Sequence, residues 1–248
     1  MKPAPPVTRT EQPGEGGGTS ADMVVRENSG VTGGRQAARP TPAFWSRRTE
    51  EVARALLGCR LVRRLPGEPP RTLVVVETEA YLGVADRAAH TWNGRRTARV
   101  EPMWGPPGHA YVFRVYGMHD CLNVVTREAG VPEAVLIRAG APLSWWRGLE
   151  TPRGELLAAS GPGRLCRALS VGRELSGASF RGPELELLLP LAGPARRMLR
   201  GPRVGVDYAG AAARWPLRFA VAGCPAVTHA SALSPDARGA PPRRGGPS

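Results

Sequence analysis

The sequence predicts an α+β fold, in which a single domain is built on a curved, largely antiparallel β-sheet flanked by helices. Short β-rich runs outnumber helical patterns, and they follow one another instead of alternating strictly with helices. One of them, 134–139, is continuously apolar, which is typical of a central strand. This order of elements argues against a doubly wound nucleotide-binding fold.

The two ends of the 248-residue chain differ in composition from its centre. Residues 1–42 are rich in Pro, Gly, Ser, Thr and charge, and they contain too little apolar area to offset the entropy of ordering the chain. Residues 228–248 have the same character. We therefore expect a disordered arm over 1–42, a folded domain over 43–227 and a disordered tail over 228–248.

The folded part is predicted to begin with a helix that Thr49 caps and Gly58 ends. Glu50 and Glu51 in its first turn suit the positive end of the helix dipole. A second helix is expected over about 161–171. The predicted strands span residues 59–64, 72–81, 110–116, 122–126, 134–139, 204–206 and 217–221.

The net charge of +13 indicates a polyanionic partner. All but one of the 34 basic Lys and Arg residues are arginine, a bias that codon composition can partly explain. The distribution is more informative, because residues 46–227 alone carry 26 basic and 16 acidic groups. The excess positive charge thus belongs to the folded part, where it favours an anion-binding surface.

Several function classes lack their usual signatures. The four cysteines form no C-x-x-C pair, the histidines form no H-E-x-x-H, and neither a P-loop nor a G-x-S-x-G motif is present. No apolar run approaches the ~20 residues of a membrane span. Lys2 is the only lysine, so lysine Schiff-base chemistry is excluded within the domain. We expect a cytoplasmic protein that needs no metal and no cofactor.

The segment VVVETEAYLG, residues 74–83, brings carboxylates to the end of an apolar strand. Glu77 and Glu79 are two residues apart, so on a strand they share one face, with Tyr81 beyond them. A buried carboxylate is costly unless it is solvated, paired or functional. From this segment alone, glutamates that pair with cations of the domain are favoured over a catalytic pair.

The loop 86–99 gathers Arg95, Arg96 and Arg99 around His90 and Trp92. Arginine side chains match phosphate oxygens with two parallel hydrogen bonds, and an adjacent ring can stack on a base. Taken by itself, a solvated arginine-rich loop remains the more ordinary interpretation in so arginine-rich a chain.

The segment 111–118 has period-2 alternation that places Tyr111 and Phe113 on one face, and for Tyr111 we favour a place in the core. Tyr116 precedes Gly117, so it is expected at an exposed turn, where an aromatic side chain can act as a wedge. Asn123 interrupts an apolar strand, and it either satisfies backbone groups or contacts a ligand.

These segments occur in a fixed order over residues 45–227, among them VETEAYLG, AAH, YGM, VLIRA, SGP and RVGV. Together they closely resemble the alkyladenine (3-methyladenine) DNA glycosylase family. The resemblance implies a monomeric, metal-independent, monofunctional enzyme of base excision repair, here a bacterial and nucleoid-associated one. It would flip a damaged purine out of double-stranded DNA and hydrolyse its N-glycosidic bond. The implied bases are 3-methyladenine and 7-methylguanine, with hypoxanthine and etheno-adenine as further candidates.

The resemblance also implies a role for individual residues. Glu79 matches the carboxylate that activates the attacking water, and Arg138 matches an arginine near that water. The matched pocket residues are Tyr81 and His90, which sandwich the flipped base, Asn123, which disfavours the exocyclic amine of guanine, and Tyr116, which intercalates where the base left. Phe113 departs from the pattern, because the mammalian member has a tyrosine there, so any polar contact at this position is lost.

Two alternatives remain open. The first is a DNA-binding module of the same fold that recognises lesions without cutting the bond, and a base-release assay separates it from an enzyme. The second is a metal-dependent phosphodiesterase that uses Glu77, Glu79 and Asp86 as oxygen ligands for Mg²⁺. Its activity would vanish in the presence of a chelator.

Overall fold

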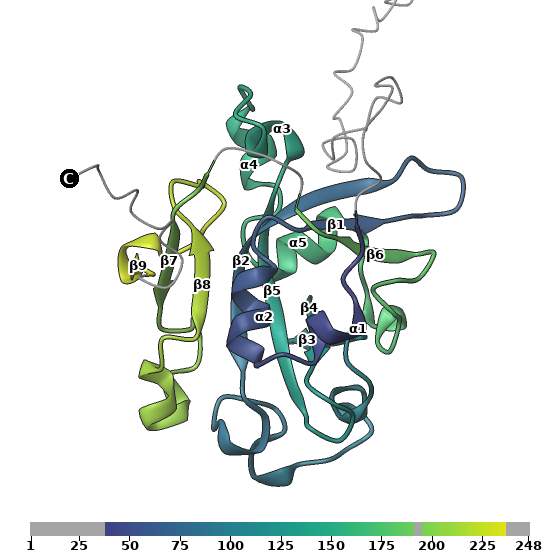
Figure 1. Cartoon of the computed structure of the whole chain (residues 1–248), viewed down its shortest axis with the longest axis vertical. Helices are drawn as coiled ribbons and strands as arrows, with labels where there is room; N and C mark the ends of the chain where they lie inside the picture. Colours follow the sequence, from purple (N-terminus) through teal and green to yellow (C-terminus); the bar gives the residue numbers. More distant parts are fainter. Residues whose placement is uncertain (1–37, 191–194, 237–248) are drawn as a thin grey trace, which may run out of the picture.

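A computed structural model describes residues 38–190 and 195–236 (Figure 1). Within these ranges nine strands form one sheet, in the order β3-β4-β5-β2-β8-β7-β9, and β1 joins it by pairing with both β2 and β6. Every pairing is antiparallel. The α+β prediction is therefore confirmed, and the apolar run 134–139 lies in an interior strand.

The bounds of the elements follow the sequence patterns in most places. The strands are β1 (Arg60–Arg63), β2 (Arg71–Tyr81), β3 (Ala110–Val115), β4 (His119–Thr126), β5 (Glu133–Ala141), β6 (Leu185–Leu188), β7 (Met198–Gly201), β8 (Arg218–Val221) and β9 (Ser234–Pro235). The α-helices are α1 (Pro42–Trp45), α2 (Thr49–Ala55), α3 (Leu143–Trp146), α4 (Arg153–Leu157) and α5 (Pro162–Ala168).

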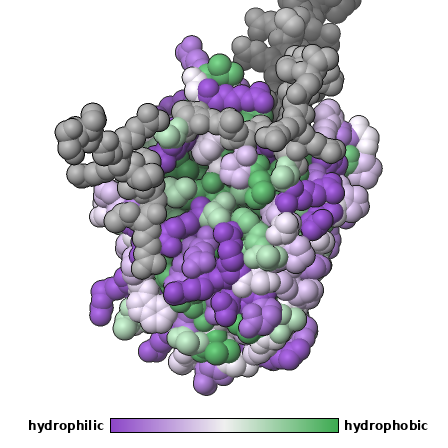
Figure 2. All heavy atoms as spheres, in the orientation of Figure 1, coloured by the Kyte–Doolittle hydropathy of each residue, from purple (hydrophilic) through white to green (hydrophobic). Residues whose placement is uncertain are grey.

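Strand β2 organises the sheet. It pairs with β5 along one edge, while its other edge pairs first with β1 and then with β8. Side chains on one face of the sheet, such as those of Val112, Leu122 and Ile137, pack with α2 and α5 in the main hydrophobic core. The opposite face of the sheet lies outside this core, and the polar residues described below project from it. Figure 2, viewed from the side on which α2 lies in front of the sheet, shows hydrophilic and hydrophobic residues intermixed on the surface.

Two local predictions are wrong. Thr49 does not cap α2 but is its first residue, because its hydroxyl group bonds the side chains of Thr126 and Glu133 instead. Residues 204–206 are not a strand. The strand of that region is β7, and the backbone N–H of Val204 is used by a side chain rather than by a neighbouring strand.

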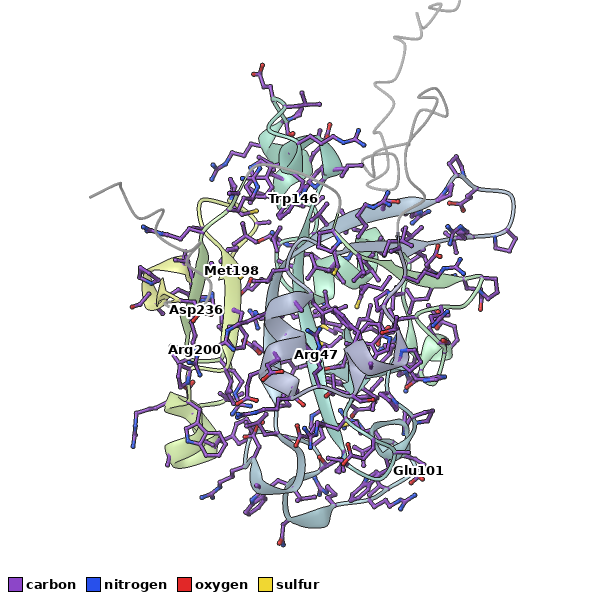
Figure 3. All side chains as sticks on the ribbon, viewed as in Figure 1. Arg47, Glu101, Trp146, Met198, Arg200 and Asp236 are labelled. Atoms are coloured by element: carbon purple, nitrogen blue, oxygen red, sulfur yellow. The ribbon has the colours of Figure 1, made fainter. Side chains whose placement is uncertain are left out.

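Residues 228–236, which the sequence assigns to the tail, are part of the described structure. Thr228 contacts Glu77, β9 pairs with β7, and Asp236 forms an ion pair with Arg54 with 2.6 Å between Nε and Oδ2. Figure 3 shows Asp236 beside Met198 and Arg200 of β7. Polar contacts, which hydrophobicity patterns do not register, thus attach this segment. Residues 38–42, which the sequence assigns to the arm, are also described: Arg39 forms an ion pair with Glu186, and α1 begins at Pro42. Residues 1–37 of the expected arm and 237–248 of the expected tail lie outside the described residues.

No helix in the described ranges has the length and apolar character needed to cross a membrane.

Candidate functional site

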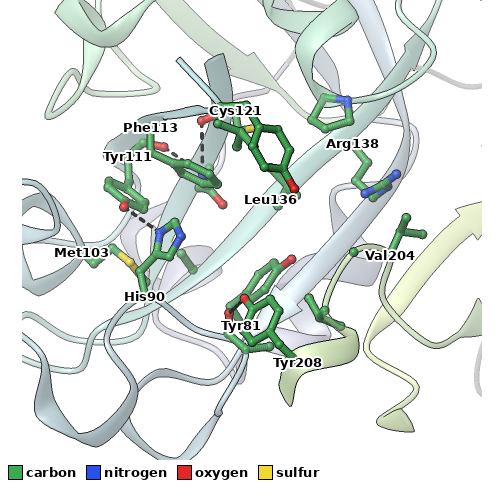
Figure 4. Close-up of a pocket in the computed structure, with 18 residues that line it drawn as sticks. Tyr81, His90, Met103, Tyr111, Phe113, Cys121, Leu136, Arg138, Val204 and Tyr208 are labelled. Carbon is green, nitrogen blue, oxygen red and sulfur yellow. Dashed lines mark hydrogen bonds between the residues drawn. The ribbon is translucent and has the colours of Figure 1, made fainter. Parts of the chain in front are cut away.

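A row of directly opposed residues crosses five strands of the sheet: Tyr111, Asn123, Leu136, Glu79 and Arg218. Directly opposed residues of antiparallel strands project from the same face. This row therefore presents its side chains on the face that the main core leaves free, and Figure 4 shows the cavity that lies over it.

The cavity has a volume of about 350 Å³, within the range of ligand pockets. Its walls include six of the side chains that the sequence singles out: Tyr81, His90, Phe113, Tyr116, Asn123 and Arg138. These residues come from β2, β3, β4, β5 and two connecting segments. The structure thus brings together residues that are up to 57 positions apart in the chain, Tyr81 and Arg138 being the extremes.

Glu79 lies below the cavity and is completely buried. Its Oε2 accepts a hydrogen bond from the Tyr81 hydroxyl at 2.9 Å, and its Oε1 accepts one from the backbone N–H of Val204 at 2.8 Å. Nη1 of Arg138 is 3.3 Å from Oε1. Burial raises the pKa of Glu79, while Arg138 and the two hydrogen bonds oppose that rise. All three of its partners line the cavity.

Glu77, two residues earlier, has a different environment. Nε of Arg138 and Nε of Arg218 both donate to its Oε1, at 3.0 and 2.7 Å, and the backbone N–H of Thr228 approaches Oε2 at 3.3 Å. Arg138 therefore bridges both glutamates. The β2–β5 register shifts on either side of Glu77, and such irregularities re-aim side chains near functional sites. Glu77 therefore forms ion pairs that connect strands of the sheet, whereas Glu79 is the carboxylate beside the cavity.

Sequence reasoning missed a second buried ion pair, in which Arg203 binds both carboxylate oxygens of Asp86. Its guanidinium also lies 4.8 Å from the centre of the Tyr81 ring. Asp86 in turn accepts hydrogen bonds from the backbone N–H groups of Leu82 and Ala88, each at 3.0 Å. The pair thus supports the Tyr81 ring and fixes the loop that leads to His90. The presence of Arg203 in the RVGV string was the available signal.

These ion pairs engage carboxylates that a phosphodiesterase of the kind considered above would need as ligands for Mg²⁺. Guanidinium groups bind Oε1 of Glu77 and both carboxylate oxygens of Asp86, and the backbone N–H of Thr228 approaches Oε2 of Glu77. No group of three or more His, Cys, Asp or Glu side chains in the described ranges is arranged to hold a metal ion.

His90 forms one wall of the cavity. Its Nδ1 lies 2.9 Å from the Tyr111 hydroxyl, and its ring meets Phe113 edge-to-face with 4.5 Å between ring centres (Figure 4). Burial, assisted by the positive charges of Arg99 and Arg95, lowers the pKa of His90 to about 4. The imidazole is therefore neutral at physiological pH. Tyr111 is buried, as expected, and it also orients this wall.

Asn123 is buried in the floor of the cavity. Its side-chain amide donates to the backbone carbonyls of Tyr111 and Cys121, at 3.0 and 3.3 Å. Both amide hydrogens are used by the backbone, so Oδ1 is the group that remains for a ligand. The two roles that the sequence left open for this residue are thus compatible.

Two exposed tyrosines border the cavity. Tyr116 occupies the β3–β4 turn with a φ of 50° and is 88% exposed, as the sequence predicts for a turn tip. Tyr208, in the 3-10 helix η5 (Asp207–Arg214), is 65% exposed, and the sequence does not predict a role for it. An aromatic side chain with that exposure beside a polar loop has no distinctive sequence pattern.

The three loop arginines do not act as one cluster. Arg95 and Arg99 lie beside His90, where both line a small adjoining cavity. Arg96 instead forms two hydrogen bonds to Glu101, at 2.9 and 2.6 Å, and its guanidinium lies 5.1 Å from the centre of the Trp104 ring. Glu101 is seen at the lower right of Figure 3.

The chain is similar to proteins that have been classified. A family model described as "Methylpurine-DNA glycosylase (MPG)" matches residues 43–225. A protein of Methanocella arvoryzae is 46% identical over 189 residues, which cover 75% of this chain and 93% of that protein. One of Bacillus cytotoxicus is 41% identical over 191 residues, with 72% and 93% covered, and one of Desulfitobacterium hafniense is 43% identical over 187 residues, with 71% and 91% covered. All three are provisionally named 3-methyladenine DNA glycosylases.

The depressed pKa of His90 predicts a pH-dependent stability. The unfolded imidazole binds a proton below its ordinary pKa of 6.5, whereas the folded one resists protonation down to about 4. Stability from this residue is therefore present above pH 6.5 and is lost as the pH falls towards 4. At pH 5 the loss amounts to at most about 2 kcal/mol. In urea unfolding at pH 7 and pH 5, His90→Gln should lose less stability than the parent protein. An equal loss would contradict the neutral imidazole.

Proposed function

Because the chain belongs to the methylpurine-DNA glycosylase family, it is a DNA glycosylase, a hydrolase of N-glycosyl bonds, and we propose that it excises 3-methyladenine and 7-methylguanine from double-stranded DNA. Hypoxanthine and etheno-adenine are further candidate substrates in this proposal. A single chain would suffice as the active unit, since all the site residues come from one chain. Residues 43–227 would form the catalytic domain, with Thr228 completing the environment of Glu77.

The observation that carries the proposal is the buried carboxylate of Glu79 below an aromatic cavity. Alkylation at N3 or N7 leaves a purine cationic, so the base departs as a neutral molecule and needs little protonation. The reaction then needs mainly a base for the attacking water. In the proposed step, Glu79 takes a proton from water, the water oxygen bonds C1′, and the electron pair of the glycosidic bond passes to the purine. The products are a free base and an abasic sugar.

Arg138 would hold Glu79 in its ionised form during this step. Its Nη1 is 3.3 Å from Oε1 of Glu79, while its Nε is held by Glu77. This second anchor keeps the guanidinium from turning away. A positioned charge of this kind requires no rearrangement when the reaction occurs.

The cavity walls suit a flat cation. Tyr81 and His90 would sandwich the flipped base, with Phe113 as a third aromatic surface, and ring faces attract positive charge. The low pKa of His90 matters here, because an imidazolium would repel a cationic purine. Asn123 would present only its oxygen to the base.

Flipping a nucleotide costs a few kcal/mol, least at a damaged pair. Tyr116, exposed on a turn that projects from the sheet, would enter the gap and offset part of that cost. Arg95 and Arg99 would contact phosphates near the cavity, while Arg96 would first have to leave Glu101.

The decisive experiment measures base release from duplex oligonucleotides that each carry one lesion, with and without chelator. We expect release of 3-methyladenine and 7-methylguanine in both conditions. A lesion-binding module would bind these duplexes without releasing base, and a magnesium phosphodiesterase would cut the strand only without chelator.

Glu79→Gln keeps the shape of the side chain and removes the proposed base. Single-turnover release should slow by at least ~10²-fold, the usual scale for general-base catalysis, while lesion binding is largely kept. The control is Glu77→Gln, whose folding should be checked by thermal unfolding because it breaks a buried pair. If a folded Glu77→Gln protein abolished excision and Glu79→Gln did not, the assignment of the base would be wrong.

Affinity for undamaged DNA should depend steeply on salt. Each phosphate neutralised contributes a slope of about −0.9 to the plot of log K against log salt. Arg95→Ala and Arg99→Ala should each flatten the slope by about that amount and weaken binding to damaged and undamaged DNA alike. Arg153→Ala, which removes one exposed charge on α4, is the matched control. A salt-independent affinity of the parent protein would refute the phosphate contacts.

The absence of lysine from residues 43–227 predicts a monofunctional enzyme. A bifunctional glycosylase links an amine to C1′ as an imine, which borohydride traps. Lys2 and the N-terminal amine are distant in sequence from the site, and an amine that is not positioned lacks the effective molarity for fast imine formation. The strand should stay intact until alkali is added, with no trapped complex. A trapped complex in a variant that lacks residues 1–42 and has a blocked terminal amine would contradict this mechanism.

A further inference from the structure

A groove of about 600 Å³ adjoins the base cavity and shares His90 and Tyr208 with it. Its other walls come from the loop around Trp92. Arg87 and Arg95 line it, and none of its lining residues is acidic. The proposed function uses Arg95 but leaves Arg87, Trp92 and Tyr208 without a role.

The exposed ring of Trp92 distinguishes this groove from an ordinary solvated loop. The side chain is 46% exposed, and the guanidinium of Arg87 lies 5.5 Å from the centre of its ring. Basic grooves that follow a nucleic-acid strand combine positive side chains with aromatic rings on which bases stack. The partly exposed ring of Trp92, with Arg87 beside it, and the two arginines supply both parts.

The loop that carries Trp92 is held in place. The buried hydroxyl of Thr91 donates to the carbonyl of Pro132 at 3.0 Å, and the backbone N–H groups of Trp92 and Arg95 bond the carbonyls of Ala89 and Trp92. On the other side of the groove, the Tyr208 hydroxyl donates to the carbonyl of Ala88 at 3.3 Å. The groove is therefore largely preformed, which lowers the entropic cost of binding.

We propose that this groove binds the nucleotide next to the flipped one on the same DNA strand, with its phosphate between Arg87 and Arg95 and its sugar or base against Trp92. The proposal rests on the proposed function, since it takes the base cavity to hold a flipped nucleotide. Its physical basis is the covalent continuity of the DNA strand. A nucleotide in the cavity is linked to its neighbours on the same strand, so the backbone that joins them must pass over the rim of the cavity. His90 and Tyr208 line both the cavity and the groove, and Figure 4 shows Tyr208 near Tyr81.

The test uses duplexes with a stable tetrahydrofuran abasic analogue, and with fluorescent 2-aminopurine as its 5′ neighbour, its 3′ neighbour or the nucleotide opposite. Trp92→Ala should raise Kd at least about fivefold, the lower end of the stacking scale, and should change the fluorescence at one same-strand position only. Trp92→Phe should retain most of the affinity. Arg87→Ala should raise Kd and flatten the salt slope by about 0.9.

The matched controls lie at the other end of the molecule. Leu149→Ala removes a 60% exposed apolar side chain near α3, and Arg153→Ala removes an exposed charge, so both should leave Kd within twofold of the parent value. Unchanged Kd and fluorescence in Trp92→Ala and Arg87→Ala, or a change confined to the opposite strand, would overturn the groove proposal.

Base release by the parent protein is measured separately. If the parent releases base while the groove variants bind as it does, the groove proposal alone fails. If the parent releases no base but the variants lose affinity for the abasic duplex, the groove stands as a DNA site and the proposed function fails.

Discussion

Two carboxylates on the most central strand impose the main constraint on this structure. Glu77 and Glu79 are both completely buried, and an unpaired buried charge is among the most costly features of a folded protein. Their compensation comes from separate parts of the chain: Arg138 on β5, Arg218 on β8, and backbone groups at Val204 and Thr228. Two glutamates that are two residues apart on β2 therefore depend on strands and segments from the second half of the chain.

The two buried glutamates have different surroundings, although the strand pattern does not distinguish them. Two guanidinium groups bind Glu77, so its charge is used in holding β2, β5 and β8 together. Glu79 has one guanidinium contact and two hydrogen bonds, and its partners open onto the cavity. Burial raises the pKa of Glu79 above that of an ordinary carboxyl group, which suits the proton acceptor proposed for it.

Arginine suits this arrangement better than lysine would. Its planar group has five donors, so Arg138 can contact two carboxylates, and Arg203 can bind Asp86 with two hydrogen bonds while its face lies over Tyr81. Inside the domain, positive charge is matched by these carboxylates. On the surface of the domain, three arginines remain exposed around the cavity, where a polyanion can reach them: Arg87, Arg95 and Arg99. The arginine bias of the sequence thus serves both interior pairing and the exposed surface.

The sequence by itself determined the fold class, most strands and which residues share a face within one strand, such as Glu79 with Tyr81 and Tyr111 with Phe113, because alternation along a strand is a local property. That these faces belong to one face of the sheet follows from the register of the strands. The sequence also indicated the exposed turn at Tyr116, since the following glycine is a local signal. Only the tertiary structure decided that the partners of Glu79 line the cavity, that Arg203 supports Tyr81, that Arg96 turns towards Glu101, and that residues 228–236 pack on the sheet. Each of these depends on partners that are near in space and remote in the chain, and local patterns of hydrophobicity carry no information about such partners.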